Sequence, residues 1–240
     1  MNKVWNSIWS SYQNIPSEQI MNEPAGKTQR EEFAELLLER FTLKGKTILE
    51  VGTGTGQYCI ELGKHGADCW GIDLEQESID LATRIASDCQ APDDMFSKED
   101  LFDLHPTTKY DIVFSMGTVE HFTDAEIIKM FEKMFEIADL VVVGVPYSGS
   151  HAYMLSKELS MQMGTWEYGV EHDFHTLYPY FYAAGGVVTV SEKTIGVVSE
   201  AMYLKRINPA LIPHQIAINE QKKLDGKPYG SWLISIGRKG

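Results

Sequence analysis

The sequence predicts an α/β protein with a doubly wound sheet, in which most strands run parallel and helices cover both faces. Short apolar runs at 47–51 and 140–145 lack the in-and-out alternation of half-exposed strands, which indicates buried parallel strands. Stretches with apolar residues at helical spacing lie between such runs, at 75–87 and 124–137. Strands that alternate with helices are joined by right-handed crossovers and therefore form a parallel sheet.

Composition and charge indicate one globular domain and disfavour several classes of partner. The 240 residues are 43% hydrophobic and 23% charged, and 21 basic against 34 acidic side chains give a formal net charge of −13. This balance disfavours a broad nucleic-acid footprint. The sequence contains no run that could cross a membrane and no secretory h-region at its start. Cysteines without C-x-x-C spacing fit a reducing compartment, so we expect a cytoplasmic protein without nucleic-acid or membrane partners.

Residues 1–44 precede the first strand, and we expect them to form a helical cap. An aromatic and aliphatic stripe at helical spacing predicts a first helix, made of Trp5, Ile8, Trp9 and Tyr12. That helix could dock on the body of the protein or close as a lid over a ligand. Residues 28–41 predict a second, amphipathic helix, and Thr28 and Glu31 have the spacing of a capping box.

A glycine-rich turn follows the first predicted strand. Its pattern is Glu50-x-Gly52-x-Gly54-x-Gly56, and the residues after it predict a helix. Glycines turn the chain tightly and bring backbone N–H groups against a ligand, so this unit predicts a nucleotide-type site at the carboxyl edge of the sheet. The spacing fits neither the dinucleotide fingerprint nor the P-loop. Asp73 ends the next strand, where it can accept hydrogen bonds from two ribose hydroxyls, and Glu50 favours a cationic ligand.

Two further stretches complete a pattern that resembles a known family. Residues 96–101 have the features of a third strand that ends in an acid, and residues 110–121 those of a fourth strand with its following loop. With the glycine turn and Asp73, they resemble the class I S-adenosylmethionine-dependent methyltransferases of the small-molecule type, over residues 45–146. The resemblance implies a Rossmann-like sheet of seven strands, mostly parallel with an antiparallel C-terminal strand. It also implies S-adenosyl-L-methionine as cofactor, with S-adenosyl-L-homocysteine as its product.

The resemblance further implies which residues hold this cofactor. Asp73 would take the ribose hydroxyls, Asp100 the adenine amino group, and the Leu101 N–H the adenine ring. Glu50 would orient the amino end of the methionine part, and Tyr12 would reach the ligand from an N-terminal lid. The full predicted set is Tyr12, Glu50, Gly52, Thr53, Gly54, Gly56, Asp73, Leu74, Asp100, Leu101, Ser115 and Met116.

The loop after the fourth strand carries a candidate base. Glu120 and His121 occupy a position where many relatives have a similar pair, and in the related cyclopropane-forming branch a comparable Glu-His-Phe lies by the acceptor. His121 is therefore a catalytic candidate, because a base is needed when the acceptor must lose a proton. His121 could instead cap a helix and bond backbone groups.

Aromatic and histidine residues gather in 147–175, just past the carboxyl end of the fifth strand. Acceptor specificity in open α/β sheets belongs at that edge. Tyr147 could stack on a flat or cationic acceptor, or pack in the core. His172 and His175, with acids beside them, could bind a metal, line an acceptor pocket or pack at the surface. No second ligand pattern supports a metal, so we predict none and take His121, His175 and Tyr147 as catalytic candidates.

The remaining chain closes the predicted domain. Residues 176–184 predict a helix, and the strands expected after it are a long or bulged one within 187–198 and a closing one at 231–237. Residues 199–230 are expected to be a second acceptor-side insertion beside 147–175. We thus expect one domain over 1–240, whose cofactor-binding core is 45–146.

The predicted activity is methyl transfer from S-adenosylmethionine to an oxygen or nitrogen of a small-molecule acceptor, by in-line displacement. An activated methyl group needs mainly positioning and exclusion of water, which an enclosed pocket with aromatic walls would provide. Two alternatives stay open. One is a protein or peptide methyltransferase with an open acidic groove, and the other is a non-catalytic methyltransferase-like binding protein. We expect a monomer or a homodimer.

Overall fold

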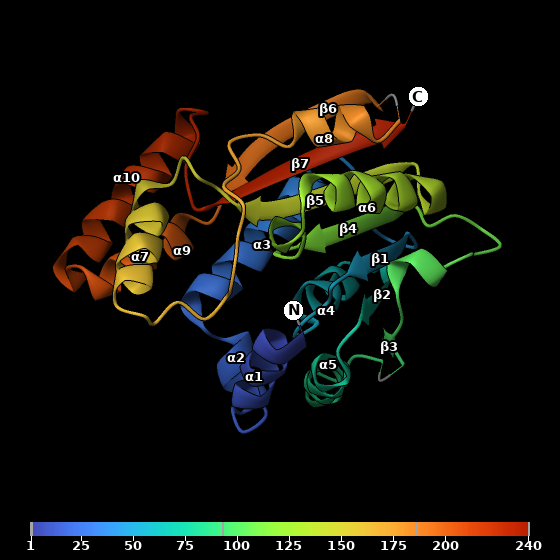
Figure 1. Ribbon diagram of the computed structural model, residues 1–240, viewed down its shortest axis with the longest axis horizontal. Coiled ribbons are helices and arrows are strands. Elements are labelled where there is room, and N and C mark those ends of the chain that lie inside the picture. Colours follow the sequence, from blue (N-terminus) through green and yellow to red (C-terminus); the bar gives the residue numbers. More distant parts are fainter. Residues whose placement is uncertain (1, 93, 186, 240) are drawn as a thin grey trace.

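A computed structural model describes residues 2–92, 94–185 and 187–239. Its centre is a seven-stranded sheet in the order β3-β2-β1-β4-β5-β7-β6 (Figure 1). Strands β1 to β5 pair in parallel, whereas β7 runs antiparallel to both β5 and β6. The strands are β1 Thr47–Val51, β2 Asp68–Asp73, β3 Phe96–Lys98, β4 Ile112–Met116, β5 Leu140–Pro146, β6 Val187–Ile195 and β7 Trp232–Lys239. The predicted fold class is therefore confirmed, including the antiparallel C-terminal strand.

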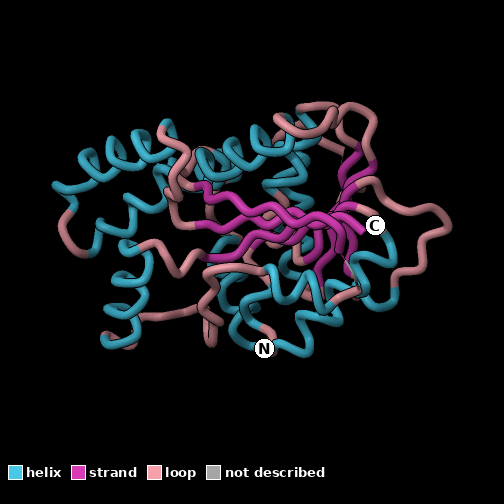
Figure 2. Tube along the Cα trace, turned by 90° about the horizontal axis from the view of Figure 1, so that it is seen from above, coloured by secondary structure: helices cyan, strands magenta, loops and turns pink. Residues whose placement is uncertain are grey.

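Each face of the sheet carries its own core, because successive strand residues point to opposite faces. On β1, Ile48 joins the core under α3, α4 and α5, whereas Leu49 joins the core under α6 and α8. Figure 2 shows that helices lie on both sides of the twisted sheet. The five helices are α3 Pro24–Leu38, α4 Gln57–Lys64, α5 Gln76–Asp88, α6 Asp124–Ile137 and α8 Tyr178–Ala183.

The helix predicted from residue 28 begins four residues earlier, at Pro24 of α3. Glu23 caps it by accepting a hydrogen bond from the Gly26 N–H at 2.6 Å, and Pro24 needs no N–H partner in the first turn. Thr28 lies inside the helix, where its hydroxyl donates to the Pro24 carbonyl at 2.8 Å. The predicted capping box is therefore wrong: the acid before the proline, rather than the threonine after it, starts the helix.

The segment predicted as an insertion over 199–230 is mostly helical. It contains most of α9 (Val197–Met202), the short turns η3 (Tyr203–Arg206) and η4 (Pro209–Leu211), and α10 (Ile212–Leu224). Buried Asn219 fastens α10 to α9 by donating to the Val197 carbonyl at 3.0 Å. With α7 (His151–Gln162), these helices form a group beyond the end of β5 (Figure 1). Within the described ranges, no helix has both the length and the apolar character that crossing a membrane requires.

The N-terminal helices pack against α5. Helix α1 (Asn2–Tyr12) contacts α5, and α2 (Ser17–Met21) follows it at the lower edge of Figure 1. Arg84 of α5 holds this segment by donating to the Ser17 hydroxyl at 3.0 Å and to the Tyr12 carbonyl at 3.3 Å. The segment is thereby fixed beside the carboxyl ends of β1 and β2.

Candidate cofactor cavity and neighbouring carboxylate cluster

A cavity of about 390 Å³ opens at the carboxyl ends of β1, β2 and β4. Its lining is mainly apolar and aromatic, with a few acidic and hydroxyl groups, which is the usual character of a small-molecule site. Helix α1 supplies one wall, through Trp5 and Trp9. The predicted residues that line it are Glu50, Gly52, Thr53, Gly54, Asp73, Leu74, Asp100, Leu101, Met116 and His121.

The glycine turn forms the floor of this cavity, and its conformation requires glycine. Gly52 and Gly54 have φ values of 74° and 54°, in the left-handed region that other residues avoid. A Cβ on Gly52 would lie 2.4 Å from the Thr118 hydroxyl oxygen, and one on Gly54 would lie 2.9 Å from the Trp9 ring. The turn therefore brings bare backbone to the cavity wall, as the spacing predicted.

Asp73 is held in a fixed orientation at the end of β2. Its Oδ2 accepts hydrogen bonds from the Gly54 N–H at 3.1 Å and the Ser78 hydroxyl at 2.8 Å, and its Oδ1 accepts from the Glu75 N–H at 3.0 Å. Each carboxylate oxygen has two lone pairs, so these three bonds leave one lone pair, on Oδ1, for a ligand's hydroxyl. Ser78, which the sequence reasoning missed, is the buried side chain that joins Asp73 to the glycine turn through the Gly54 carbonyl at 2.9 Å.

Glu50 is a buried acid at the base of the cavity, with 1% of its surface exposed. Its Oε2 accepts a hydrogen bond from the Thr53 hydroxyl at 2.9 Å. Burial raises the pKa of Glu50 to about 8, against the lowering effect of the hydrogen bonds from Thr53 and Cys59. A cation bound in the cavity would favour the ionised form, which fits the predicted positive ligand.

Three apolar side chains of the lining suit a flat ring. Leu74 and Phe102 are both about half exposed although they line the cavity, and Leu101, which also lines it, is buried. Asp100 caps the short turn η1 (Leu101–Asp103), because its Oδ1 accepts from the Phe102 N–H at 2.9 Å. Phe102 is a second residue that the sequence reasoning missed, since nothing in its spacing distinguishes it from a core aromatic.

Three predicted cofactor residues lie outside the cavity lining. Ser115 is fully buried and its hydroxyl donates to the Val51 carbonyl at 2.8 Å. Gly56 has a φ of 70° and faces Phe96, whose ring would lie 2.4 Å from a Cβ at this position. Tyr12 packs beside Trp9, with ring centroids 6.4 Å apart. The cavity is approached by Trp5 and Trp9 of α1 instead, whose rings stack at 5.8 Å.

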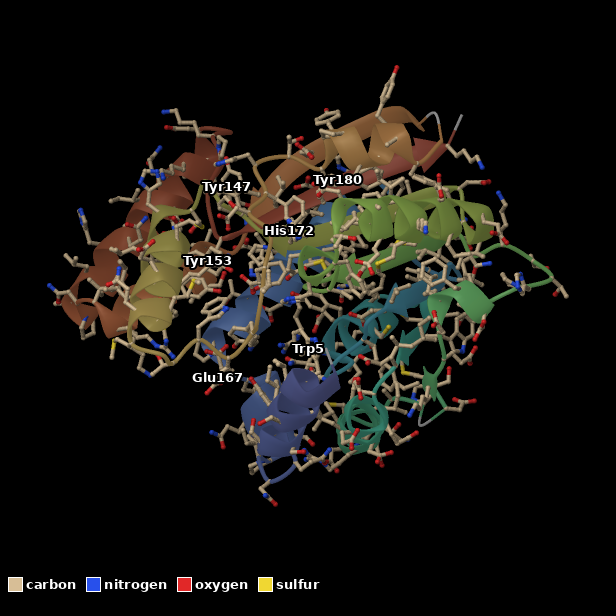
Figure 3. The ribbon with its side chains drawn as sticks, in the orientation of Figure 1. Trp5, Tyr147, Tyr153, Glu167, His172 and Tyr180 are labelled. Carbon is tan, nitrogen blue, oxygen red and sulfur yellow. The ribbon has the colours of Figure 1, made fainter. Side chains whose placement is uncertain are left out.

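The structure separates the three predicted catalytic residues. His121 lines the cavity, and its ring meets that of Trp5 edge-on at 4.8 Å. Tyr147 and His175 face each other at 6.2 Å but line a different cavity of about 500 Å³, between α3, β6 and the segment before β7. Figure 3 shows Tyr147 near the end of β5 and Trp5 on α1, well apart in the view.

A cluster of charged groups adjoins His121. His121 and Glu120 belong to the turn η2 (Val119–His121), and Glu171 comes from the segment after α7. The Lys157 ammonium lies 3.3 Å from Glu171 and 3.0 Å from Asp173. Burial raises the pKa of Glu120 to about 8 and lowers the pKa of His121, so the low-dielectric surroundings favour the neutral form of both.

The comparisons with known proteins agree with this architecture. Residues 48–139 match the family model described as a methyltransferase domain. The core of this chain is a class I methyltransferase domain. The fold of nearly the whole chain is also similar to that of the magnesium protoporphyrin IX methyltransferase of Synechocystis PCC 6803 with bound S-adenosylhomocysteine. The TM-score is 0.62 at 16% identity, over 99% of this chain and 94% of the other.

Curated relatives share the methyltransferase domain over part of their length. The chain is 29% identical over 133 residues to the ubiquinone biosynthesis O-methyltransferase of Coxiella burnetii strain Dugway 5J108-111, which is 48% of this chain and 56% of that protein. It is 30% identical over 86 residues to the S-adenosyl-L-methionine-dependent Diels-Alderase iccD of Talaromyces variabilis, covering 34% and 30%. The chain thus spans about half the length of the first of these relatives.

Proposed function

We propose that the chain is an S-adenosylmethionine-dependent methyltransferase that acts on an oxygen or nitrogen atom of a small molecule. The observation that carries this proposal is the fixed carboxylate of Asp73 beside the bare glycine turn, in a cavity of about 390 Å³. The methyltransferase domain match and the S-adenosylhomocysteine in the Synechocystis relative support the same ligand class.

The residues present fit this cofactor. Asp73 would hold a ribose hydroxyl, Leu74 and Phe102 would cover the adenine ring, and Glu50 would face the positively charged methionine end. When bound, S-adenosylmethionine supplies a methyl group that its sulfonium centre already activates. The chain then holds the acceptor in line with the methyl group and excludes water, and these two effects together supply much of the acceleration of methyl transfer. Trp5, Trp9 and Met116 are the apolar wall residues suited to that exclusion.

His121 is the predicted catalytic residue that faces this cavity. The Val170 carbonyl lies 3.0 Å from its Nδ1, and this contact fixes the ring orientation. A neutral imidazole in this position would serve an acceptor that must lose a proton. We therefore place the acceptor on the side of the cavity bounded by Trp5 and His121, where Val170 of the segment 147–175 contacts His121. Tyr147 and His175 line the second cavity, so we assign them no part in the transfer step.

A second candidate function is cofactor binding without methyl transfer. It is favoured by one specific observation, the partial similarity to a protein named as an S-adenosylmethionine-dependent Diels-Alderase. In that case the same cavity would hold the cofactor, and the adjoining residues would serve another reaction.

Transfer of a labelled methyl group separates the two functions. S-[methyl-³H]adenosylmethionine is incubated with the protein and with panels of small phenols, carboxylic acids and amines, and label in the extracted products is counted. We expect wild type to label members of one panel and Asp73→Asn to label none at the same cofactor concentration. Cofactor binding by wild type without transfer to any panel would contradict methyl transfer to these acceptor classes and favour the second function.

A further inference from the structure

The segment that follows α7 returns to the site and fixes a second acid, Glu171, beside the Glu120–His121 pair. The His172 N–H donates to the Glu120 carbonyl at 2.8 Å, and His121 Nδ1 lies 3.0 Å from the Val170 carbonyl. These contacts on either side of Glu171 hold it against η2. One ligand atom from each of Glu120, His121 and Glu171 then lies within 4.8 Å of the others. In Figure 3, His172 marks this returning segment and Tyr153 marks α7 next to it.

The burial of Glu120 and its missing hydrogen-bond partner distinguish this cluster from an ordinary group of acidic side chains. It is 2% exposed, and its Oε2 has no hydrogen-bond partner among the residues that the structure describes, although the atom is buried. A buried acceptor without a partner costs about 1–3 kcal/mol, and more when it is charged. Oε1 of the same carboxylate lies 3.9 Å from His121 Nε2. The Glu120 carboxylate therefore lies next to the ligand atoms of His121 and Glu171.

His121 presents the nitrogen that a metal ion would use. A ring nitrogen that faces a backbone carbonyl carries the proton, so the contact of Nδ1 with Val170 leaves the lone pair on Nε2. This Nε2 is the atom 3.9 Å from Glu120 Oε1. Two atoms that each lie ~2.0–2.2 Å from a tetrahedral ion are separated by roughly 3.3–3.6 Å, so a slight approach of the two side chains completes the pair.

Glu171 has one partner that orients it, Tyr153, and one that would compete with a metal ion for its carboxylate, Lys157. The Tyr153 hydroxyl donates to Glu171 Oε2, in the manner of the outer hydrogen bonds that orient metal-binding carboxylates. Lys157 lies 3.3 Å from the same oxygen, but it also has Asp173 at 3.0 Å and the rings of Tyr153 and Trp166 within 6 Å. Lys157 can therefore keep Asp173 as its partner when an ion takes a Glu171 oxygen.

We propose that Glu120, His121 and Glu171 form a binding site for one divalent transition-metal ion at the edge of the cofactor cavity. One imidazole and two carboxylates are ligands for ions such as Zn²⁺ and Mn²⁺. His121 also lines the cavity, so the ion would lie where an acceptor approaches. In that state His121 acts as a ligand rather than as the base considered above. The site does not depend on methyl transfer, because it would bind the ion in either proposed function.

The test uses the metals alone on the full chain. Protein stripped with a chelator is titrated with Zn²⁺ by calorimetry and with Mn²⁺ by the loss of the free-ion EPR signal. We expect one equivalent to bind to wild type, and the affinity to fall at least about tenfold in Glu120→Gln and in Glu171→Gln. The matched control is Glu167→Gln, which removes an exposed carboxylate of the same segment that lies outside the cluster. Its metal affinity should stay within about twofold of wild type.

Two results would overturn the proposal. One is the absence of saturable binding of either ion to wild type whose circular dichroism shows a folded protein. The other is binding that persists in both glutamine variants, which would place the ion elsewhere. Titration of S-adenosylhomocysteine into the same metal-free wild type is scored separately, so a failed metal site and a failed cofactor site give different results.

Discussion

The buried acid Glu50 couples the cofactor cavity to the stability of the whole fold. Its pKa is raised to about 8 in the folded protein by burial, from an ordinary value near 4.5. The folded state therefore holds a proton over this interval that the unfolded state has released. This contribution is fully present below about pH 4.5 and is lost as the pH rises to about 8.

We predict that Glu50→Gln removes this pH dependence. Glutamine keeps an oxygen for the Thr53 hydroxyl but cannot ionise. Urea unfolding at pH 5, 6.5 and 8 measures the free energy of unfolding of both proteins. The difference, wild type minus variant, should decrease steadily across the three values. A difference that is constant or that rises with pH would show that Glu50 is not held in its neutral form by burial.

Gly52 of the turn and Gly63 of helix α4 differ in conformation and in the space around them, and paired substitutions test this. Gly52→Ala should lower the free energy of unfolding by about 1–3 kcal/mol and weaken binding of S-adenosylhomocysteine, because φ is 74° and Thr118 occupies the space of a Cβ. Gly63 lies inside α4 with no atom within 4 Å of a Cβ position. Gly63→Ala should therefore be neutral, or stabilise the fold by up to about 1 kcal/mol.

Chemical denaturation of the two alanine variants measures the free energy of unfolding, and calorimetric titration measures the affinity for S-adenosylhomocysteine. Equal losses of stability in both variants would contradict the structural distinction between them. Retention of full ligand affinity by a folded Gly52→Ala protein would show that bare backbone at this position is not needed for binding.

At the scale of elements, helix α1 distinguishes this cavity from an open crevice. Trp5 and Trp9 line it, Trp5 also meets the His121 ring at 4.8 Å, and Trp9 covers Gly54. The stripe at helical spacing predicted this helix, with docking or a lid as its two possible roles. In the structure, the helix packs on the body against α5 and its aromatic face forms a cavity wall, whereas closure as a lid over a ligand stays a prediction.

Truncation of this wall should weaken cofactor binding without unfolding the protein. We predict that Trp9→Ala raises the dissociation constant for S-adenosylhomocysteine roughly tenfold, which corresponds to about 1.4 kcal/mol of lost burial. The matched control is Val4→Ala, an exposed position on the same helix. Calorimetry on the two variants decides between the roles, since equal affinities in both would make α1 a docked helix with no part in the site.

The local patterns of the sequence predicted some elements well and others poorly, for physical reasons. Residues 124–137 were predicted as a helix, and α6 has these bounds, because its apolar stripe and its capping residues Thr123 and Glu126 agree. The predicted start of α3 was wrong because Glu23 caps the helix and Pro24 begins it, whereas the capping box predicted from Thr28 and Glu31 does not form. The helical content of 199–230 was not predicted, because Pro209 and Pro213 obscure a helical pattern although each lies in the first turn of its element, where proline is tolerated.

At the scale of the whole molecule, the sheet order explains which site residues could be foreseen. Strands β1, β2 and β4 are neighbours, so the residues just after them meet in one cavity, and motifs in sequence order were enough to identify ten of its 23 lining residues. Tyr147 and His175 could not be placed this way. Tyr147 follows β5 directly, where its N–H bonds the Ser231 carbonyl beside β7, and this pairing turns it towards the second cavity.

The carboxylate cluster depends on contacts that no local pattern reveals. Glu120 and Glu171 are fifty-one positions apart in sequence, and the bond from the His172 N–H to the Glu120 carbonyl brings them together. The histidines that spacing suggested as metal ligands, His172 and His175, do not join the cluster of candidate ligand atoms. Tertiary backbone pairing, rather than i to i+3 spacing, therefore determines which side chains share this space.

The central claim is that Asp73 and the glycine turn hold S-adenosylmethionine, and calorimetric titration tests it most directly. S-adenosylmethionine and S-adenosylhomocysteine are titrated into wild type, Asp73→Asn and the control Asp103→Asn, an exposed acid outside the cavity lining. We predict dissociation constants on the order of micromolar for wild type and control, and about a 100-fold loss in Asp73→Asn, since a hydrogen bond to a charged group, worth about 1.5–3 kcal/mol, is weakened. Failure of both ligands to bind folded wild type, or equal affinity in Asp73→Asn, would contradict the account.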